Sequence, residues 1–214
     1  MAYLKNHHYK VLPLGEVVDA IKAGKHLPFK SVVITFDDGY EDNYTEAYPI
    51  LKKYGFTATI FLISDSINTD GFLKLEQIRD MLAHNINFGA HTRTHAYLPG
   101  VSTQQRRDEI FGSKKILEEQ LGVKISNFAY PTGGFNDEIK KIVEEAGYAS
   151  AVTTNRGHDR FNHDLYELKR VRLSDHDTRN DYLWSKLSGF YNLFRKLKEP
   201  SSVKSQCRIE KSDS

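Results

Sequence analysis

The sequence of 214 residues contains one cysteine, Cys207, and one tryptophan. A single cysteine cannot form an intrachain disulfide, and it cannot supply a cluster of thiolate metal ligands. Any metal ion would therefore have to be held by His, Asp or Glu side chains. This absence narrows the search for a site to the oxygen and imidazole ligands of the chain.

Long hydrophobic runs are absent as well. Nowhere do about 18 apolar residues follow one another, so the sequence predicts no membrane-spanning helix and gives no reason to expect membrane association. The first ten residues contain Lys5, His7 and His8 in place of the apolar run of a secretion signal. The sequence as it stands predicts a cytoplasmic protein, or a cell-envelope protein if a leader precedes it.

An excess of charge of one sign is also missing. The chain has 30 basic and 28 acidic residues, interspersed along most of its length, for a net charge of +2. Nucleic acid is therefore not an expected partner. With 39% hydrophobic residues the chain can bury one sizeable core. We expect one domain over residues 8–198, followed by a disordered tail at 199–214 with almost no apolar content.

Short apolar runs alternate with amphipathic stretches, which is typical of βα units around a mostly parallel sheet or barrel. The expected strands cover residues 31–36, 57–63, 88–90, 128–130, 149–153 and 168–173. The expected helices cover residues 41–54, 75–84, 104–121 and 136–146, with a further helix from 183 that would close over the barrel. The helix at 136–146 has the clearest end signals, with Asn136 as N-cap and Gly147 after its last turn.

Asp37 and Asp38 follow the apolar strand that ends at Phe36. Carboxylates at the carboxyl end of such a strand face the loops where barrel active sites are assembled, although an isolated Asp-Asp-Gly is more often a solvated turn. His91 and His95 follow another strand at a spacing that allows both imidazoles to bind one ion. Two His and one carboxylate leave coordination positions open, which favours a catalytic metal over a structural one.

The second carboxylate could then take a proton from a water that attacks a carbonyl carbon. The negative oxygen formed in that attack needs hydrogen-bond donors. A Pro-Thr-Gly-Gly turn, residues 131–134, follows the strand at 128–130 and is suited to presenting a backbone N–H there.

These segments resemble the polysaccharide deacetylases, or NodB-homology domains, among the carbohydrate esterases. The sequence Thr-Phe-Asp-Asp-Gly at 35–39 is similar to the first motif of that family, and His-Thr-Arg-Thr-His at 91–95 is similar to the second. Phe-Ala-Tyr-Pro-Thr-Gly at 128–133 resembles the third motif in the branch that contains poly-N-acetylglucosamine deacetylases. The resemblance extends from about Tyr9 to Leu197.

The resemblance implies a distorted (β/α) barrel with about seven parallel strands. It implies a divalent metal ion, most simply Zn²⁺ with Co²⁺ or Ni²⁺ as alternatives, held by Asp38, His91 and His95. Asp37 would be the general base, and the backbone N–H of Thr132 would bind the oxyanion. The residues that would contact substrate are Tyr40, Tyr130, Pro131, Gly133, Arg156 and Arg170.

The sequence departs from the family pattern at two points. Many members have an Arg in the third motif that pairs with the base, and this chain has Ala129 there. Either Arg156 or Arg170 could take that role. The later motif that supplies a general acid is not recognisable, and we interpret His158, His163 and His176 as ordinary loop residues. Protonated Asp37 or a metal-bound water could then serve as the acid.

Three functions are compatible with these residues. The first is removal of N-acetyl groups from N-acetylglucosamine units of an acetylated polysaccharide or oligosaccharide. The second is hydrolysis of O-acetyl esters or small cyclic amides at the same site. The third is glycan binding by a weakly active relative, suggested by the missing Arg and the unassigned acid.

Overall fold

A computed structural model of the chain describes residues 1–155, 162–174, 177 and 179–188. Its centre is a curved six-stranded sheet in which every pairing is parallel and the order is β3-β4-β5-β6-β7-β8. A separate parallel pair joins β1 to β2. The predicted class, an α/β fold with a distorted parallel barrel, is confirmed, as an open half-barrel with fewer strands in its main sheet than expected. The strands are β1 (Lys10–Val11), β2 (Ser31–Val32), β3 (Thr35–Phe36), β4 (Ala58–Leu62), β5 (Ile86–Ala90), β6 (Asn127–Ala129), β7 (Ser150–Thr153) and β8 (Leu168–Lys169).

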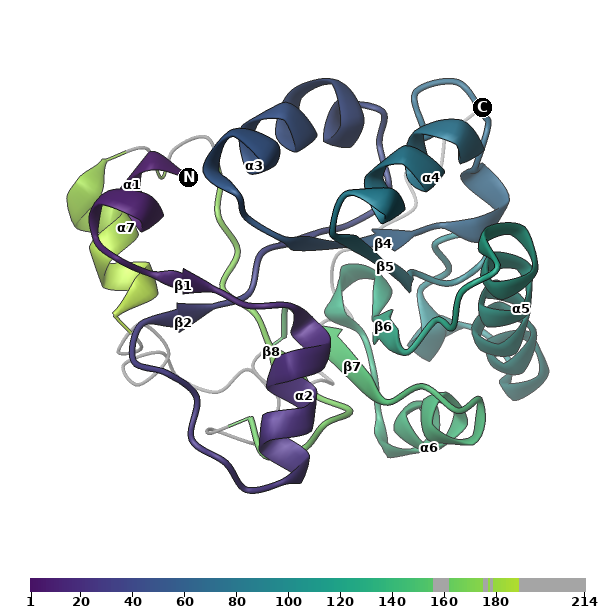
Figure 1. Cartoon of the computed structure of the whole chain (residues 1–214). Coiled ribbons are helices and arrows are strands. Elements are labelled where there is room, and N and C mark those ends of the chain that lie inside the picture. The colour runs from purple at the N-terminus through teal and green to yellow at the C-terminus, as the bar shows by residue number, and fades with distance from the viewer. Residues whose placement is uncertain (156–161, 175–176, 178, 189–214) are drawn as a thin grey trace, which may run out of the picture.

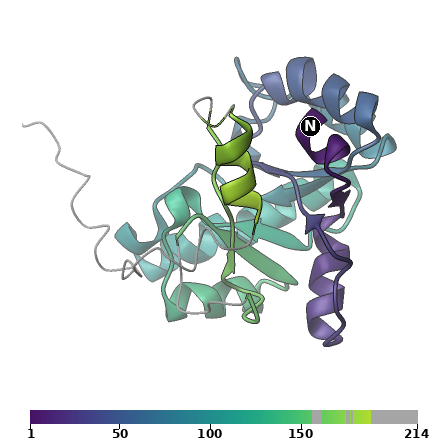
Figure 2. The same cartoon turned by 90° about the vertical axis from the view of Figure 1, so that its left-hand side faces the viewer.

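Helices α3 to α6 surround the outer side of the sheet, while α1 and α7 lie on the side of the molecule opposite α5 (Figures 1 and 2). Among the described helices, none is both long enough and apolar enough to span a bilayer. The α-helices are α1 (Ala2–Asn6), α2 (Leu14–Lys22), α3 (Tyr48–Tyr54), α4 (Leu75–Ala83), α5 (Thr103–Leu121), α6 (Asp137–Glu145) and α7 (Asn180–Leu187). Shorter helical segments are η1 (Asn43–Ala47, a π-helix), η2 (Ser64–Ser66), η3 (Leu98–Gly100) and η4 (Pro131–Gly133).

Two predicted elements are divided in the structure. The single strand expected at 31–36 is wrong: its first half, β2, pairs with β1 and its second half, β3, pairs with β4. The helix expected at 41–54 begins as the π-helix η1 and becomes α-helical only at Tyr48. Pro49 explains this change, because it has no backbone N–H to donate to the preceding turn. The elements α1, β1 and α2 were not predicted.

Helix α6 has the ends that its sequence predicts. The Asn136 side chain accepts a hydrogen bond from the backbone N–H of Ile139 at 2.9 Å. Gly147, with a φ of 77°, adopts the left-handed conformation just beyond the helix. The apolar face of α6, formed by Ile139, Ile142 and Val143, is buried in the core. The predicted C-terminal helix is present from Asn180 to Leu187, and its remainder, like the predicted tail at 199–214, lies outside the described residues.

The core lies between the sheet and its helices. Every residue of β4 is buried, which explains why that strand is a continuous apolar run with no polar alternation. Parallel pairing places the carboxyl ends of all six strands at one edge of the sheet. Polar residues that follow these strands are therefore brought together there.

Gly89 in β5 shows how tightly this sheet is packed. A Cβ atom at that position would lie 2.5 Å from Cδ1 of Phe61 and 2.8 Å from the carbonyl oxygen of Asn127. We expect Gly89→Ala to lower the free energy of unfolding by about 1–3 kcal/mol, through overpacking. Urea denaturation measures the change. Gly15→Ala in α2 is the matched control, because a Cβ there meets nothing within 4 Å; equal effects of the two changes would contradict the prediction.

Candidate active site

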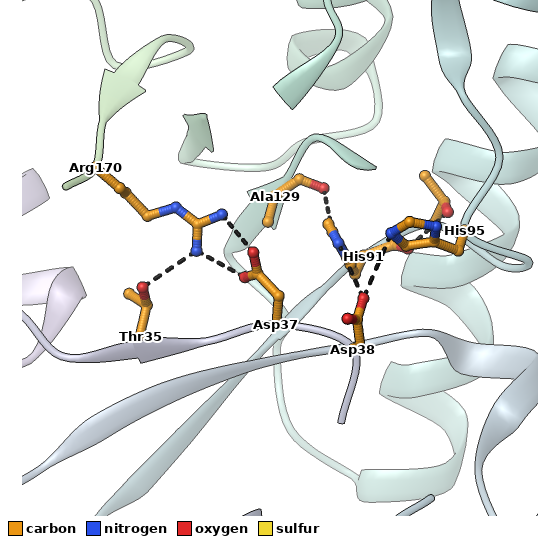
Figure 3. Close-up of polar contacts among 8 residues, drawn as sticks. Thr35, Asp37, Asp38, His91, His95, Ala129 and Arg170 are labelled. Carbon is orange, nitrogen blue, oxygen red and sulfur yellow. Dashed lines mark hydrogen bonds and ion pairs between the residues drawn. The ribbon is translucent and has the colours of Figure 1, made fainter. Parts of the chain in front are cut away.

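The candidate site lies at the carboxyl edge of the sheet, on residues that follow four of its strands. Asp37 and Asp38 follow β3, His91 follows β5, Thr132 follows β6 and Arg170 follows β8. His95 is carried by the same loop as His91. Side chains separated by more than 130 positions in the sequence thus meet at one point, as Figure 3 shows.

Asp38, His91 and His95 converge through three potential ligand atoms that all lie within 4.8 Å of one another. Oδ1 of Asp38 is 3.5 Å from Nε2 of His91 and 3.4 Å from Nε2 of His95. In a tetrahedral site with bonds of about 2.1 Å, ligand atoms are separated by about 3.4 Å. The two distances from Asp38 to the imidazoles therefore match the spacing of ligands around one ion such as Zn²⁺.

The protonation of His91 supports the same conclusion. Its Nδ1–H donates a hydrogen bond of 2.8 Å to the backbone carbonyl of Ala129, so the lone pair of the neutral ring is on Nε2, facing Asp38. Burial lowers the pKa of His91 and favours that neutral form, against the opposing effect of nearby Asp37. Oδ1 of Asp38 is buried and, among the described residues, has no hydrogen-bond partner. The lone pair on Nε2 of His91 and Oδ1 of Asp38 thus face each other with no proton between them. A cation bound between them would satisfy both groups.

Asp37 lies beside this trio but has a different partner. Arg170 donates two hydrogen bonds to its carboxylate, at 2.6 and 2.7 Å, and a third to the hydroxyl of Thr35 at 3.1 Å. Burial on its own would raise the pKa of Asp37, but the Arg170 hydrogen bonds and charge, together with the two imidazoles, bring it below its usual range. Asp37 is therefore held ionised and in a fixed orientation.

Arg170 thus pairs with Asp37, as the Arg of the third motif does in many family members; this chain has Ala129 at that position. The sequence left Arg156 and Arg170 as alternatives; Arg170 contacts Asp37, and Arg156 lies outside the described residues. Ala129 contributes in another way, because its carbonyl orients His91. A side chain is not needed for that contact, so the motif gives no sign of it.

The backbone of the site adopts, at four positions, a left-handed conformation that residues other than glycine rarely adopt. Asp38, Thr92, His95 and Thr132 all have left-handed φ values, between 52° and 72°. Each such residue costs about 1–3 kcal/mol and persists only where surrounding contacts enforce it. Gly39 continues the left-handed turn after Asp38, and a Cβ on it would lie 2.7 Å from Cδ2 of Leu62. This turn lets Asp37 face Arg170 while Asp38 faces the two imidazoles.

Three of the remaining predicted residues, Thr132, Gly133 and Tyr130, line the cavity that contains the site. Thr132 is exposed and lines a cavity of about 1870 Å³ together with Asp37, Asp38, both imidazoles and Gly133. Tyr130 also borders that cavity, but its ring is buried and its hydroxyl donates to the carbonyl of Tyr166 at 2.8 Å.

Two further predicted residues lie away from the cavity lining. Pro131 is buried. Tyr40 is 47% exposed, its ring centroid lies 5.1 Å from that of Phe72, and the negative charge of Asp38 raises its pKa. Roles for Tyr40, Tyr130, Pro131 and Gly133 in substrate binding stay predictions.

Of the three histidines interpreted as ordinary loop residues, one lies within the described part of the chain. His163 is exposed and lines the cavity. His158 and His176 lie outside the described residues. Glu109 on α5 was missed by sequence reasoning, although it is buried against the loop that carries His91 and His95.

The structure is a parallel half-barrel with a carboxylate pair and two imidazoles at its carboxyl edge. Known protein families include one with this combination of fold and residues. Residues 24–151 match the family model described as polysaccharide deacetylase. The chain therefore belongs to the polysaccharide deacetylase family, a family of hydrolases.

Three relatives illustrate the similarity. The chain is 40% identical over 174 residues to YxkH of Bacillus subtilis (strain 168), whose name assigns it to the polysaccharide deacetylases; the match covers 81% of this chain and 62% of that protein. It is 30% identical to the poly-beta-1,6-N-acetyl-D-glucosamine N-deacetylase of Staphylococcus aureus (strain MSSA476), over 81% of this chain and 64% of that one. The chain thus spans less than two thirds of the length of these curated relatives.

Among solved structures, the Streptococcus pyogenes deacetylase PplD, in complex with acetate, superimposes with a TM-score of 0.80 at 32% identity. The match covers 87% of this chain and 83% of that one. The half-barrel is therefore shared nearly completely with a deacetylase.

Proposed function

We propose that this chain removes N-acetyl groups from N-acetylglucosamine units of a polysaccharide, in a reaction that requires a divalent metal ion, with Zn²⁺ as the first choice. The observation that carries the proposal is the convergence of Asp38, His91 and His95 on one point beside the Arg170-oriented carboxylate of Asp37. Similarity to the Staphylococcus aureus N-deacetylase supports the choice of substrate.

The residues of the chain divide the work. Asp38, His91 and His95 would hold the ion, and a bound divalent ion makes a water more acidic and polarises a carbonyl group. Asp37 is held ionised beside them and would accept the proton of the attacking water as the water oxygen bonds to the acetyl carbon. The backbone N–H of Thr132 would donate to the negative oxygen that develops on the carbonyl. When the carbon–nitrogen bond breaks, protonated Asp37 would return the proton to the leaving amine, and acetate departs.

The cavity that contains the site has a volume of about 1870 Å³ and extends from the strand ends to α1, α2 and α7. That volume exceeds the roughly 300–1,000 Å³ of typical small-ligand pockets, so the cavity has room for several sugar units. The alternative of a weakly active glycan-binding relative was motivated by the missing Arg and the unassigned acid. Arg170, which follows β8, supplies a cation beside Asp37 and so answers the first of these two points.

The test is acetate release from acetylated chito-oligosaccharides. Enzyme depleted of metal with a chelator should be inactive, and adding Zn²⁺, Co²⁺ or Ni²⁺ should restore activity. O-acetylated xylan and a small cyclic amide serve as parallel substrates. Tight metal and glycan binding without turnover on any of them would overturn the proposal, and turnover of the ester or the cyclic amide alone would redirect it to the second function.

Arg170 provides a pH-dependent prediction for the same reaction. Without the guanidinium, burial is the dominant influence on Asp37 and raises its pKa. The base is active only when ionised, so activity is lost as pH falls through that pKa. In Arg170→Gln the acidic limb of the kcat/KM profile should therefore move to higher pH, and the loss of activity should be larger at pH 5 than at pH 8.

The pH profile of each variant, recorded at saturating metal, measures this shift. Arg107→Gln is a suitable control, because Arg107 forms an exposed ion pair with Glu145 at 2.8 Å away from the site. Arg170→Lys keeps the charge but not the paired hydrogen bonds, and should give an intermediate shift. An unmoved acidic limb in Arg170→Gln would show that Asp37 is not the titrating base.

A further inference from the structure

One buried side chain of α5 holds the loop that carries both histidines. The carboxylate of Glu109, which is 5% exposed, accepts hydrogen bonds from the backbone N–H groups of Arg93 and Thr94, at 2.8 and 2.9 Å. It also accepts a bond of 2.7 Å from the hydroxyl of Thr94. All three donors lie between His91 and His95.

The conformation of the loop from His91 to His95 depends on a hydrogen-bond acceptor beside the N–H groups of Arg93 and Thr94. Thr92 and His95, on either side of the two donors, have φ values of 64° and 62°. Successive N–H groups in such a turn point to one side and form a concavity that binds an anion. Glu109 fills the concavity, so the cost of the left-handed residues is offset by three charge-assisted hydrogen bonds.

Arg93, in the same loop, has a second set of contacts with α5 and η2. One turn after Glu109, Gly112 allows the side chain of Arg93 to lie across the helix: a Cβ on Gly112 would be 2.6 Å from Cδ of Arg93. The guanidinium of Arg93 then reaches Asp65 of η2 at 2.8 Å. The backbone of η2 also holds the loop, because the N–H of Ser64 donates to the carbonyl of Thr92 at 3.2 Å.

The two histidines depend on this support to different degrees. His91 is buried and has a second anchor in the carbonyl of Ala129. The side chain of His95 is 36% exposed, and its backbone follows directly after Thr94. The position of the His95 imidazole relative to Asp38 is therefore set mainly by the loop that Glu109 holds.

We propose that Glu109 is a positioning residue that fixes the distance between the His91 and His95 imidazoles and so determines the affinity and coordination geometry of the metal site. The inference rests on the proposed function only in taking these residues as metal ligands. Glu109 acts through the loop, because its carboxylate is occupied by Arg93 and Thr94.

Glu109→Gln is the direct test, because the amide keeps the shape of the side chain but removes its negative charge and replaces one of its two acceptor oxygens by a donor. Zinc affinity, measured by competition with a chromophoric chelator, should fall by about 10- to 100-fold, as for other groups that orient metal ligands. The visible absorption spectrum of the Co²⁺-loaded variant should also change, because coordination geometry determines that spectrum.

Glu118→Gln is the matched control. Glu118 lies on the same helix and accepts a hydrogen bond from the backbone N–H of Ile125 at 2.9 Å, so the variant makes the same change of charge and acceptor on α5, away from the loop that carries His91 and His95. Its zinc affinity and Co²⁺ spectrum should equal those of the parent protein. Thr94→Val removes a single bond to Glu109 and should give a smaller shift in the same direction, and it replaces Glu109→Gln if that variant does not fold.

Each outcome is decisive. If Glu109→Gln, or Thr94→Val in its place, binds zinc and Co²⁺ as the Glu118→Gln control does, the inference is overturned. It is also overturned if the parent protein binds no metal. If the parent protein releases no acetate but binds zinc in a Glu109-dependent way, the proposed function fails and the positioning role stands.

Discussion

Replacement of Asp37 by Asn is expected to lower kcat by about 10²- to 10⁴-fold, the usual contribution of a positioned general base. Asn has the shape of Asp but cannot accept the proton of the attacking water. Asp37 lies beside the proposed ligands but is not one of the three residues, Asp38, His91 and His95, whose ligand atoms converge. Zinc affinity should therefore stay within a few-fold of the parent value, and acetate release with a parallel zinc titration measures both quantities.

The control for this change is Asp42→Asn, which removes an exposed carboxylate from the same strand-to-helix connection. Its activity should be unchanged. Thermal unfolding of both variants monitors the fold, because Asp37→Asn leaves the guanidinium of Arg170 without its anionic partner. A folded, zinc-loaded Asp37→Asn enzyme with more than a tenth of the parent activity would contradict the role of Asp37 as base.

Loss of His95 is expected to reduce zinc affinity by more than about 100-fold, the upper range for groups that only orient ligands. The variant His95→Ala is the informative one, because this side chain is 36% exposed and its removal should not unfold the protein. Activity at micromolar zinc should be lost with the affinity. Chelator competition and acetate release, measured on the same preparation, test the link between the two.

Two further histidine variants complete the comparison. His91→Ala should lose zinc affinity to the same degree and also be less stable by about 1–3 kcal/mol, because the buried carbonyl of Ala129 loses its donor. His84→Ala is the control: His84 is exposed at the end of α4, where its Nδ1 hydrogen-bonds to the carbonyl of Asp80. Unchanged zinc affinity in His95→Ala would show that His95 is not a ligand.

The adjacent carboxylates illustrate how one fold gives similar groups different tasks. Asp37 is paired with a cation and two hydrogen bonds, while Oδ1 of Asp38 has no hydrogen-bond partner within the described part of the chain and faces two imidazoles. The left-handed backbone at Asp38 and Gly39 separates the two side chains. In the proposed mechanism, these different surroundings give one carboxylate the task of proton transfer and the other that of metal binding.

Hydrophobic pattern and local end signals predicted much of the fold. Strands β4 to β7 and helices α4 to α6 were located from apolar runs and periodicity, because burial within a parallel sheet requires them. The division of residues 31–36 between β2 and β3 was not predictable in this way, since the pattern shows that a strand is buried but not which strands it pairs with. The short N-terminal elements have too few residues for a period to be recognised.

For the candidate site, the sequence by itself was enough to predict Asp37, Asp38, His91 and His95, because the two histidines lie on one loop and the two carboxylates at one strand end, adjacent along the chain. It also showed that a cation for Asp37 was missing from the third motif. Only the tertiary structure decided which Arg supplies it, since 133 positions separate Arg170 from Asp37. The same holds for the Ala129 carbonyl behind His91 and for Glu109 beneath the loop that carries His91 and His95. These contacts join strand ends and helices that meet only after the sheet has curved, and no local pattern specifies them.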